Sequence, residues 1–290
     1  MVPTQIDLIK KYKLSVRGHL GQHLLLDPNL QRKIVEELEL KKSDFVIEIG
    51  PGLGALTQFI LQSGCRLLAV EKDPRFAEIL RTEWKPAKGG SFGIAVGDIL
   101  KTDLLTAARA AGWTAGKWKV VGNLPYYITA PIIFRLLEYR DSISTAVLTV
   151  QKEVGNRLAA VPGNKDYGRM TLGVRYAADV RKILDLSPSC FTPKPAVASC
   201  AVRMDFHEKK NEAREAHYFE LVRIAFSQRR KTLLSLLAHA AGGQWKREDL
   251  LGIFEALGLS HDVRGEELLI KDYLALVAAL EKIGWPAKDR

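Results

Sequence analysis

Cysteine is scarce in this 290-residue sequence: Cys65, Cys190 and Cys200 are the complete set, and no two of them form a Cys-x-x-Cys pair. A disulfide framework and a structural zinc site are therefore not expected. The chain also lacks a stretch of about 18 uninterrupted apolar residues, which a membrane-spanning helix needs. Its N-terminal segment lacks the apolar core of a secretory signal. We therefore expect a soluble, cytoplasmic protein.

Acidic residues are in deficit, with 33 Asp and Glu against 43 Lys and Arg and a formal net charge of +10. The excess lies in residues 1–205, which contain 29 Lys and Arg and 20 Asp and Glu. A basic surface suggests a polyanionic partner such as nucleic acid or an anionic membrane surface, but charge alone does not choose between them. A hydrophobic content of 47% excludes a disordered chain.

Between residues 45 and 150, short apolar runs rich in β-branched residues alternate with helical patterns, which predicts a parallel sheet covered on both faces. Two later strands are separated by the proline-rich segment FTPKPAV, which leaves no room for a crossover helix and favours an antiparallel end to the sheet. The seven predicted strands are Phe45–Gly50, Arg66–Glu71, Phe92–Val96, Lys119–Gly122, Thr145–Val150, Val180–Leu186 and Ala198–Phe206.

After Phe206 the pattern becomes helical throughout, with glycines between the segments. The predicted helices run from His217 to His239, Lys246 to Leu257 and Glu266 to Ile283. We therefore predict two domains, an α/β domain over residues 1–207 and a small all-helical domain over residues 208–290.

The first predicted strand ends in a glycine-rich turn with Gly50, Gly52 and Gly54. Glycine lets the backbone turn sharply and approach a ligand at the carboxyl end of a strand. The spacing is GxGxG, whereas dinucleotide-binding turns read GxGxxG, and Pro51 removes an N–H that would hold a pyrophosphate. The turn predicts a cofactor site and disfavours a nicotinamide dehydrogenase, although the glycines alone also fit an ordinary strand-to-helix turn.

The next two strands each end in a carboxylate. Glu71 follows Gly50 by 21 residues, a spacing at which a carboxylate accepts hydrogen bonds from both ribose hydroxyls. Asp98 ends the third strand, where it is placed to accept from an adenine amine. Either acid alone is more often a helix cap or a surface residue, but the ordered set favours a nucleoside-containing cofactor.

The fourth strand runs into Asn123-Leu124-Pro125-Tyr126. An amine on an aromatic ring is a poor nucleophile because its lone pair is delocalised into the ring. The Asn123 side-chain oxygen and the Leu124 carbonyl, held by the rigid Pro125, can accept both amine protons and draw the nitrogen toward tetrahedral geometry. Tyr126 offers a face for the base to stack on. The alternative is a plain turn with the tyrosine in the core.

Nine segments, which together span nearly the whole chain, form one ordered series. They read, in chain order, GQHLLLD, EIGPGLG, VEKD, VGD, VGNLPYYIT, VQKEV, DYGRM, FTPKP and FSQRRKTL. This series resembles the S-adenosylmethionine-dependent rRNA adenine dimethyltransferases of the small-subunit (KsgA) type. The resemblance implies a Rossmann-like class I methyltransferase fold and a product of two adjacent N6,N6-dimethyladenosines in a loop near the 3′ end of small-subunit rRNA.

The resemblance also implies the residues of the site. S-adenosylmethionine is expected as the cofactor, with no metal, and Phe191 is expected to stack on the flipped base opposite Tyr126, with a core position as its alternative. His23 stands where the family usually has Asn and remains an expected contact, and Leu25 is expected to act through its backbone. The expected cofactor-binding residues are His23, Leu25, Gly50, Glu71, Asp98 and Asn123.

Cations outnumber acids between residues 152 and 182, and an Arg-Arg-Lys run follows in the helical domain, where we place it on a helix. Phosphate contact is the natural role of such clusters, although a charge run is often only a solvated face. We expect small-subunit rRNA or an immature 30S-type subunit and no membrane as partner, a role in subunit biogenesis, and a monomeric enzyme. The expected RNA-binding residues are Lys152, Arg157, Arg169, Arg229, Arg230 and Lys231.

Two rival functions remain open. One is a large-subunit rRNA adenine methyltransferase of the antibiotic-resistance type, which usually shows a different turn from NLPYYIT. The other is a ribosome-assembly or transcription factor that keeps the fold without catalysis, against which the intact Glu71, Asp98 and Asn123 argue.

Overall fold

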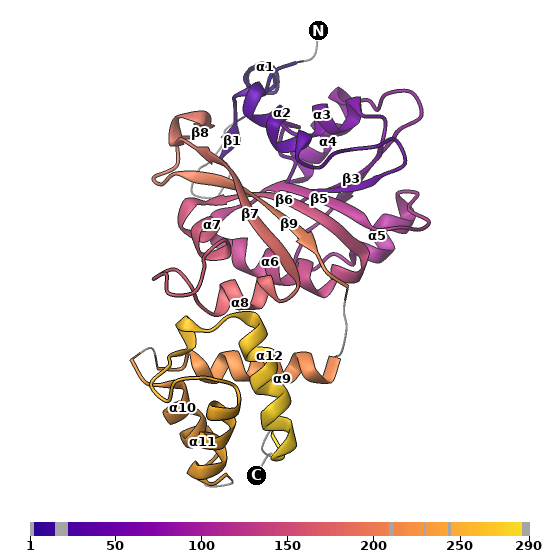
Figure 1. Cartoon of the computed structure of the whole chain (residues 1–290). Helices are drawn as coiled ribbons and strands as arrows, with labels where there is room; N and C mark the ends of the chain where they lie inside the picture. Colours follow the sequence, from indigo (N-terminus) through magenta and orange to yellow (C-terminus); the bar gives the residue numbers. More distant parts are fainter. Residues whose placement is uncertain (1–2, 15–22, 209–211, 229, 243–244, 286–290) are drawn as a thin grey trace. The chain divides into compact units, whose positions relative to one another are not determined.

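The computed structural model describes residues 3–14, 23–208, 212–228, 230–242 and 245–285 (Figure 1). The chain divides into two compact units, one formed by Met1–Gly155 with Ala178–Glu208 and the other by Asn156–Ala177 with Lys209–Arg290. The last of the three breaks, after Glu208, lies one residue from the predicted boundary. Residues 156–177, which we assigned to the α/β domain, group instead with the helices.

The first unit contains a seven-stranded sheet in the order β4-β3-β2-β5-β6-β9-β7. The five strands from β4 to β6 run parallel, and β9 is antiparallel to both of its neighbours. The predicted mostly parallel sheet with an antiparallel end is therefore confirmed. The strands are β2 (Phe45–Ile49), β3 (Arg66–Glu71), β4 (Ser91–Val96), β5 (Trp118–Asn123), β6 (Ile143–Gln151), β7 (Ala178–Leu186) and β9 (Ser199–Phe206).

Helices cover both faces of this sheet, with α2, α3 and α4 on one side and α5 and α6 on the other (Figure 1). Three of them start at an aspartate whose carboxylate accepts from the backbone of the first turn, namely Asp27, Asp73 and Asp103. The helices of this unit are α1 (Gln5–Lys11), α2 (Pro28–Glu36), α3 (Thr57–Gln62), α4 (Pro74–Glu83), α5 (Leu104–Ala110) and α6 (Thr129–Glu138), with short 3₁₀ turns η2 (Tyr126–Ile128), η3 (Arg140–Ser142) and η4 (Pro188–Cys190).

A second, two-stranded sheet was not predicted. It pairs β1 (Leu24–Leu25) with β8 (Phe191–Thr192) in antiparallel register. The backbone N–H of Leu26 also donates to the Cys190 carbonyl at 2.8 Å. These contacts hold the segment after His23 beside the end of the main sheet.

The second unit is helical and has its own apolar core, which includes Tyr218, Leu237, Phe254 and Leu276. Residues 156–177 join it through side-chain hydrogen bonds: the Tyr167 hydroxyl donates to the Leu268 carbonyl at 2.8 Å. The helices are α8 (Arg169–Arg175), α9 (Glu212–Ala225), α10 (Leu233–Ala240), α11 (Arg247–Ala256) and α12 (Ile270–Lys282), with η5 (Gly265–Glu267); α7 (Lys152–Leu158) begins in the first unit and ends in this one.

The single helix predicted from His217 to His239 is wrong, because the structure has two helices there. Thr232 starts the second one, with its hydroxyl accepting from the Ser235 N–H at 3.3 Å. Across the described parts of the chain, no helix has the length and apolar character needed to cross a membrane.

Candidate active site

The site lies where the strand order of the sheet reverses, at the carboxyl ends of β2 and β5. The turn after β2 places Gly50 at φ +62° and Gly54 at φ +85°. A Cβ atom on Gly54 would lie 2.2 Å from Nε1 of Trp84, whose N–H donates to the Leu53 carbonyl. At Gly50 a Cβ would meet nothing, so the left-handed backbone rather than crowding favours glycine there.

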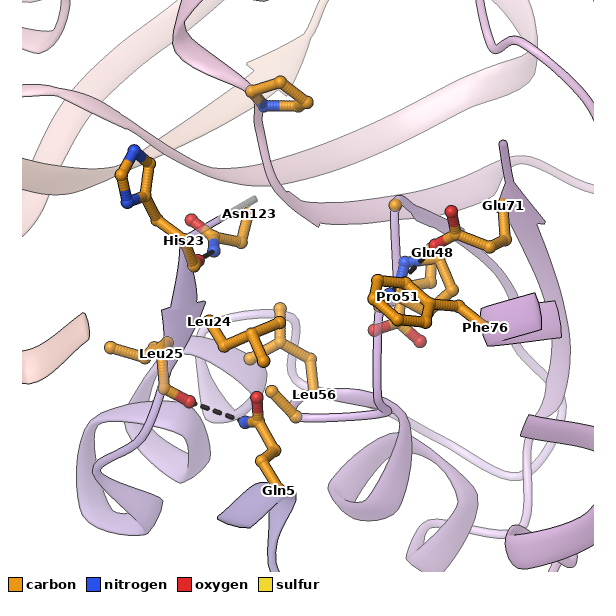
Figure 2. A pocket seen from close by; sticks show the side chains of 14 residues that line it. Gln5, His23, Leu24, Leu25, Glu48, Pro51, Leu56, Glu71, Phe76 and Asn123 are labelled. Atoms are coloured by element: carbon orange, nitrogen blue, oxygen red, sulfur yellow. Dashed lines mark hydrogen bonds between the residues drawn. The ribbon is translucent and has the colours of Figure 1, made fainter. Parts of the chain in front are cut away.

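A cavity of about 100 Å³, here called the acceptor cavity, opens between this turn and β1 (Figure 2). His23 and Asn123 stand on one side of it, and Glu48 and Glu71 on the other. Its described wall contains two carboxyl groups and no Lys or Arg. The residues lining it are Gln5, His23, Leu24, Leu25, Glu48, Gly50, Pro51, Gly52, Ala55, Leu56, Glu71, Phe76, Asn123 and Pro125.

Glu48 is a buried acid in this wall, 1% exposed, and accepts a hydrogen bond from the Thr57 hydroxyl at 2.6 Å. Burial raises the pKa of Glu48 to about 8; the Thr57 bond opposes this and the nearby Glu71 charge adds to it. Its carboxyl is therefore mostly protonated at neutral pH and contributes polarity without a full charge.

Glu71 ends β3 and is 6% exposed. One carboxylate oxygen accepts from the Gly52 N–H at 3.0 Å and the other from the Asp73 N–H at 2.8 Å. Burial raises the pKa of Glu71, and these two backbone bonds oppose the rise. Each oxygen keeps a second lone pair, so the fixed carboxylate can still accept two ligand hydroxyls.

A second cavity of about 540 Å³, here called the isoleucine cavity, lies beside the first and shares Gly50, Glu71 and Pro125 with it. Asp98 is in its wall and accepts from the Leu100 N–H at 3.0 Å and from Lys72 Nζ at 3.0 Å. These two bonds, the backbone one first, lower the pKa of Asp98. The other residues lining it are Ile49, Val70, Lys72, Asp73, Pro74, Arg75, Gly97, Ile99, Tyr127, Ile128 and Ile132.

Asn123 is fixed in orientation at the end of β5. Its Nδ2 atom donates to the His23 carbonyl at 2.7 Å, which leaves Oδ1 as an acceptor at the edge of the acceptor cavity (Figure 2). The turn that follows is held at both ends: the Leu124 N–H donates to the Thr149 carbonyl at 3.0 Å, and the Thr129 hydroxyl donates to the Pro125 carbonyl at 3.1 Å. The predicted acceptors of this turn therefore stand in a rigid frame.

Tyr126 lies beside Asn123, half-buried, with its hydroxyl 2.6 Å from the Ser199 hydroxyl. The imidazole of His23 stacks on its ring, with centroids 5.3 Å apart and planes inclined by 21°. His23 Nδ1 is 2.7 Å from the Pro193 carbonyl, which only accepts, so this nitrogen carries the proton. His23 thus contacts the site through its carbonyl and its ring together.

The structure bears on two expected roles. Phe191 is 3% exposed, packs in the apolar core and does not line the acceptor cavity, so the ring facing Tyr126 is that of His23. The Leu25 carbonyl already accepts from two buried glutamines, Gln5 and Gln31, each at 2.6 Å. Both lone pairs of that oxygen are therefore engaged, while a cofactor contact through the backbone N–H of Leu25 stays a prediction.

The predicted RNA-binding residues are exposed wherever the structure describes them, and Arg229 lies outside the described residues. Arg230 and Lys231 stand in the turn between α9 and α10 and not on a helix as predicted, because α10 begins only after the Thr232 cap. Lys152 is in the first unit, 3.4 Å from Asp185, while the second unit carries Arg157, Arg169, Arg230 and Lys231.

Sequence reasoning missed Gln5 and the isoleucines of the second cavity. A single glutamine at the start of a helix carries no signal of burial. Ile128 and Ile132 are four residues apart at the start of α6, so they lie on one helical face. This spacing is the one pattern from which part of the wall of the isoleucine cavity could have been predicted.

A family model described as ribosomal RNA adenine dimethylase matches residues 13–274. The chain belongs to the ribosomal RNA adenine dimethylase family. The expected enzyme class, an rRNA adenine dimethyltransferase of a family that uses S-adenosylmethionine, is thereby confirmed.

Relatives and solved structures agree with this assignment. The chain is 41% identical over 277 residues to ribosomal RNA small subunit methyltransferase A of Desulforapulum autotrophicum, covering 94% of this chain and 95% of the relative. It is 38% identical over 273 residues to the protein of that name from Halothermothrix orenii, covering 93% and 90%. A dimethyladenosine transferase from Plasmodium falciparum superposes with a TM-score of 0.72 at 27% identity, covering 90% and 98%.

The 23S rRNA methyltransferase ErmE also superposes, with a TM-score of 0.68 over 89% of this chain and 99% of that one. At 21% identity it shows a common fold alone. Together with the seven-stranded sheet, these likenesses confirm the predicted Rossmann-like methyltransferase fold.

Proposed function

We propose that this enzyme transfers methyl groups from S-adenosylmethionine to N6 of two adjacent adenosines in a loop near the 3′ end of small-subunit rRNA. The relatives from Desulforapulum and Halothermothrix are named ribosomal RNA small subunit methyltransferase A, which supports the small subunit as the source of the substrate. The observation that carries the proposal is the fixed Asn123 amide, whose Oδ1 faces the cavity mouth as an acceptor.

The walls of the two cavities fit the proposed cofactor. A sulfonium and an ammonium give it positive charge, which suits the acceptor cavity, whose described wall holds two carboxyls and neither Lys nor Arg. A pyrophosphate would instead need donors, and Pro51 lacks an N–H. Glu71 would accept the ribose hydroxyls and Asp98 the adenine amine, while Gly50 leaves open space beside the turn. When bound, S-adenosylmethionine supplies an electrophilic methyl group on its sulfur.

The residues after β5 prepare the amine. Asn123 Oδ1 and the Leu124 carbonyl accept its two N–H bonds, which localises the lone pair on N6 and directs it along one line. Because the methyl donor is already strongly electrophilic, orientation of the amine is what the protein must contribute. The rigid frame from Thr149 and Thr129 keeps both acceptors in place during the transfer.

Tyr126 holds the flipped base by stacking. With ring centroids 5.3 Å apart, the gap between Tyr126 and His23 leaves no room for a third ring. A base on this face of Tyr126 therefore displaces the imidazole, and the Pro193 carbonyl loses its donor at that moment. The buried Phe191 takes no part in this arrangement.

We assign phosphate contacts to the exposed cations of the two units, Lys152, Arg157, Arg169, Arg230 and Lys231, and extend the assignment to Arg229 by its place in the same run. Backbone contacts of this kind position an RNA without reading its sequence. The proposed partner is an immature 30S-type subunit, on which a monomeric enzyme acts in the cytoplasm during subunit biogenesis.

The proposal is tested by incubating the protein with radiolabelled S-adenosylmethionine and either undermethylated small subunits or large-subunit rRNA. Label is expected in the small-subunit rRNA alone. Label found only in large-subunit rRNA would instead support the antibiotic-resistance type of methyltransferase, with which the chain shares its fold.

A further inference from the structure

Gln5, the first residue of α1, lines the acceptor cavity with a side chain that is only 6% exposed. Its Nε2 atom donates to the Leu25 carbonyl at 2.6 Å (Figure 2). Its Oε1 atom is buried and has no hydrogen-bond partner among the residues that the structure describes. A buried acceptor without a donor is costly, and such atoms are rare in native proteins unless a ligand or water completes them.

The nitrogen and the oxygen of the Gln5 amide cannot exchange places. A backbone carbonyl oxygen only accepts, so the atom 2.6 Å from the Leu25 oxygen must be the nitrogen, and the oxygen of Gln5 must point elsewhere. Figure 2 shows it directed away from Leu25, on the side of Leu24 and Leu56. The unpartnered acceptor therefore belongs to the wall of the cavity.

Gln31 is a natural contrast. It donates to the same Leu25 carbonyl at the same distance of 2.6 Å and is 2% exposed. Its own oxygen, however, accepts from Gln58 Nε2 at 3.0 Å, and Gln31 does not line the cavity. Of the two glutamines that hold Leu25, only Gln5 has an acceptor to offer.

The donors of the proposed cofactor can be assigned one by one. The ribose hydroxyls go to Glu71 and the adenine amine to Asp98, which leaves the ammonium group of the methionine part as the remaining strong donor. We propose that Gln5 Oε1 accepts a hydrogen bond from this ammonium group, so that α1 takes part in cofactor recognition. The inference depends on the proposed cofactor, and it adds a residue that the motifs of the family do not include.

The test compares binding of S-adenosylhomocysteine with that of its deaminated analogue by isothermal titration calorimetry. The wild-type protein should bind the deaminated analogue more weakly by about tenfold or more, the usual scale for a hydrogen bond to a charged group. Gln5→Met should weaken S-adenosylhomocysteine by about the same factor and leave the deaminated analogue within about twofold.

Gln31→Met is the matched control, because it removes an equivalent N–H from the Leu25 carbonyl while leaving the cavity wall intact. It should keep the wild-type preference for the amino group. Gln5→Glu should also keep it, since a protonated glutamate can still donate to Leu25 and offer its second oxygen. Thermal unfolding shows whether Gln5→Met and Gln31→Met lose comparable stability.

Equal weakening of both ligands by Gln5→Met, or no weakening at all, would overturn the role of Gln5 while leaving the cofactor assignment standing. A wild-type protein that fails to bind S-adenosylhomocysteine would contradict the proposed cofactor itself, and the role of Gln5 with it.

Discussion

The acceptor cavity and the isoleucine cavity adjoin each other but differ in the burial and the pKa of their carboxyl groups. In the acceptor cavity Glu48 is 1% exposed, and burial raises its pKa. In the isoleucine cavity the Asp98 side chain is 22% exposed, and a backbone N–H and Lys72 lower its pKa. The acceptor cavity thus keeps Glu48 buried and mostly uncharged. In the isoleucine cavity the negative charge of Asp98 is already compensated by Lys72.

This difference implies that the two cavities recognise different properties of a ligand. A wall of buried acceptors distinguishes ligands by charge, because electrostatic interactions are strong where water is excluded. The isoleucine cavity, in which Asp98 is already paired with Lys72, distinguishes ligands more by the shape of its apolar side chains than by their charge. Glu71 stands in both walls, so it links the two parts of the proposed cofactor.

The largest effect is expected at Asn123, which belongs to the acceptor cavity alone. Asn123→Ala should lower the single-turnover rate of methyl transfer by about 10²- to 10³-fold, because one acceptor for the reacting amine is lost. The affinity for S-adenosylhomocysteine should change by no more than about threefold. Asn29→Ala, at an exposed position on α2, is the control and should keep the full rate. Full activity in Asn123→Ala would remove this residue from the mechanism.

Glu48 should make the first unit less stable as the pH rises. Its pKa is about 8 in the folded protein against an ordinary value of 4.5, so the folded state holds the proton that the unfolded state releases between these values. Stability should therefore fall by ~3 kcal/mol from pH 5 to pH 8 on account of this group. Urea unfolding followed by tryptophan fluorescence should show Glu48→Gln without this loss.

The sign should be opposite for Asp98, whose lowered pKa gives stability that is present at neutral pH and is lost as the pH falls through the folded value. If Glu48→Gln and the wild-type protein share one pH profile, the carboxyl of Glu48 is charged in the folded state and the contrast between the cavities fails.

A smaller effect should separate Glu71 and Asp98, the two carboxylates that we propose for the adenosine part. Glu71→Gln should weaken S-adenosylhomocysteine by about 10- to 100-fold, since the buried carboxylate accepts two ligand hydroxyls. Asp98→Asn should cost only about three- to tenfold, because that side chain is solvated and already bonded to Lys72. Asp103→Asn, at the α5 cap outside both cavities, is the control. Equal losses at Glu71 and Asp98 would show that the cavities do not differ as proposed.

The main sheet could be predicted from the sequence because its strands are long, apolar and bounded by glycine or acid. Arg66–Glu71 was predicted to the residue, and the antiparallel pairing of the last two strands followed from the prolines between them. The two-residue strands Leu24–Leu25 and Phe191–Thr192 could not be predicted, because so short a pair has no periodicity and its partners are far apart in sequence.

Two further differences have a similar physical origin. Composition places the domain boundary near residue 207, and it does not reveal that Tyr167 bonds to Leu268 within the second unit. The sequence pattern predicts one helix across residues 227–232, because the polar residues there are compatible with an exposed helical face. It does not reveal that Thr232 caps a new helix.

In the site, motif spacing predicts residues that the structure places around the two cavities, namely Gly50, Glu71, Asp98 and Asn123, since parallel strands bring their ends together. Motif spacing does not predict contacts that depend on tertiary packing. Phe191 is in the core because it pairs with the buried Leu25, and the hydrogen bond between Asn123 and the His23 carbonyl joins residues that no local pattern connects.

The most direct test is a nucleoside analysis of small-subunit rRNA from an undermethylated source after incubation with the protein and S-adenosylmethionine, using mass spectrometry of fragments from the 3′ end. The account predicts N6,N6-dimethyladenosine at two adjacent positions with the wild-type protein and neither with Asn123→Ala. Unmodified adenosines with the wild-type protein, or equal modification with both proteins, would contradict it.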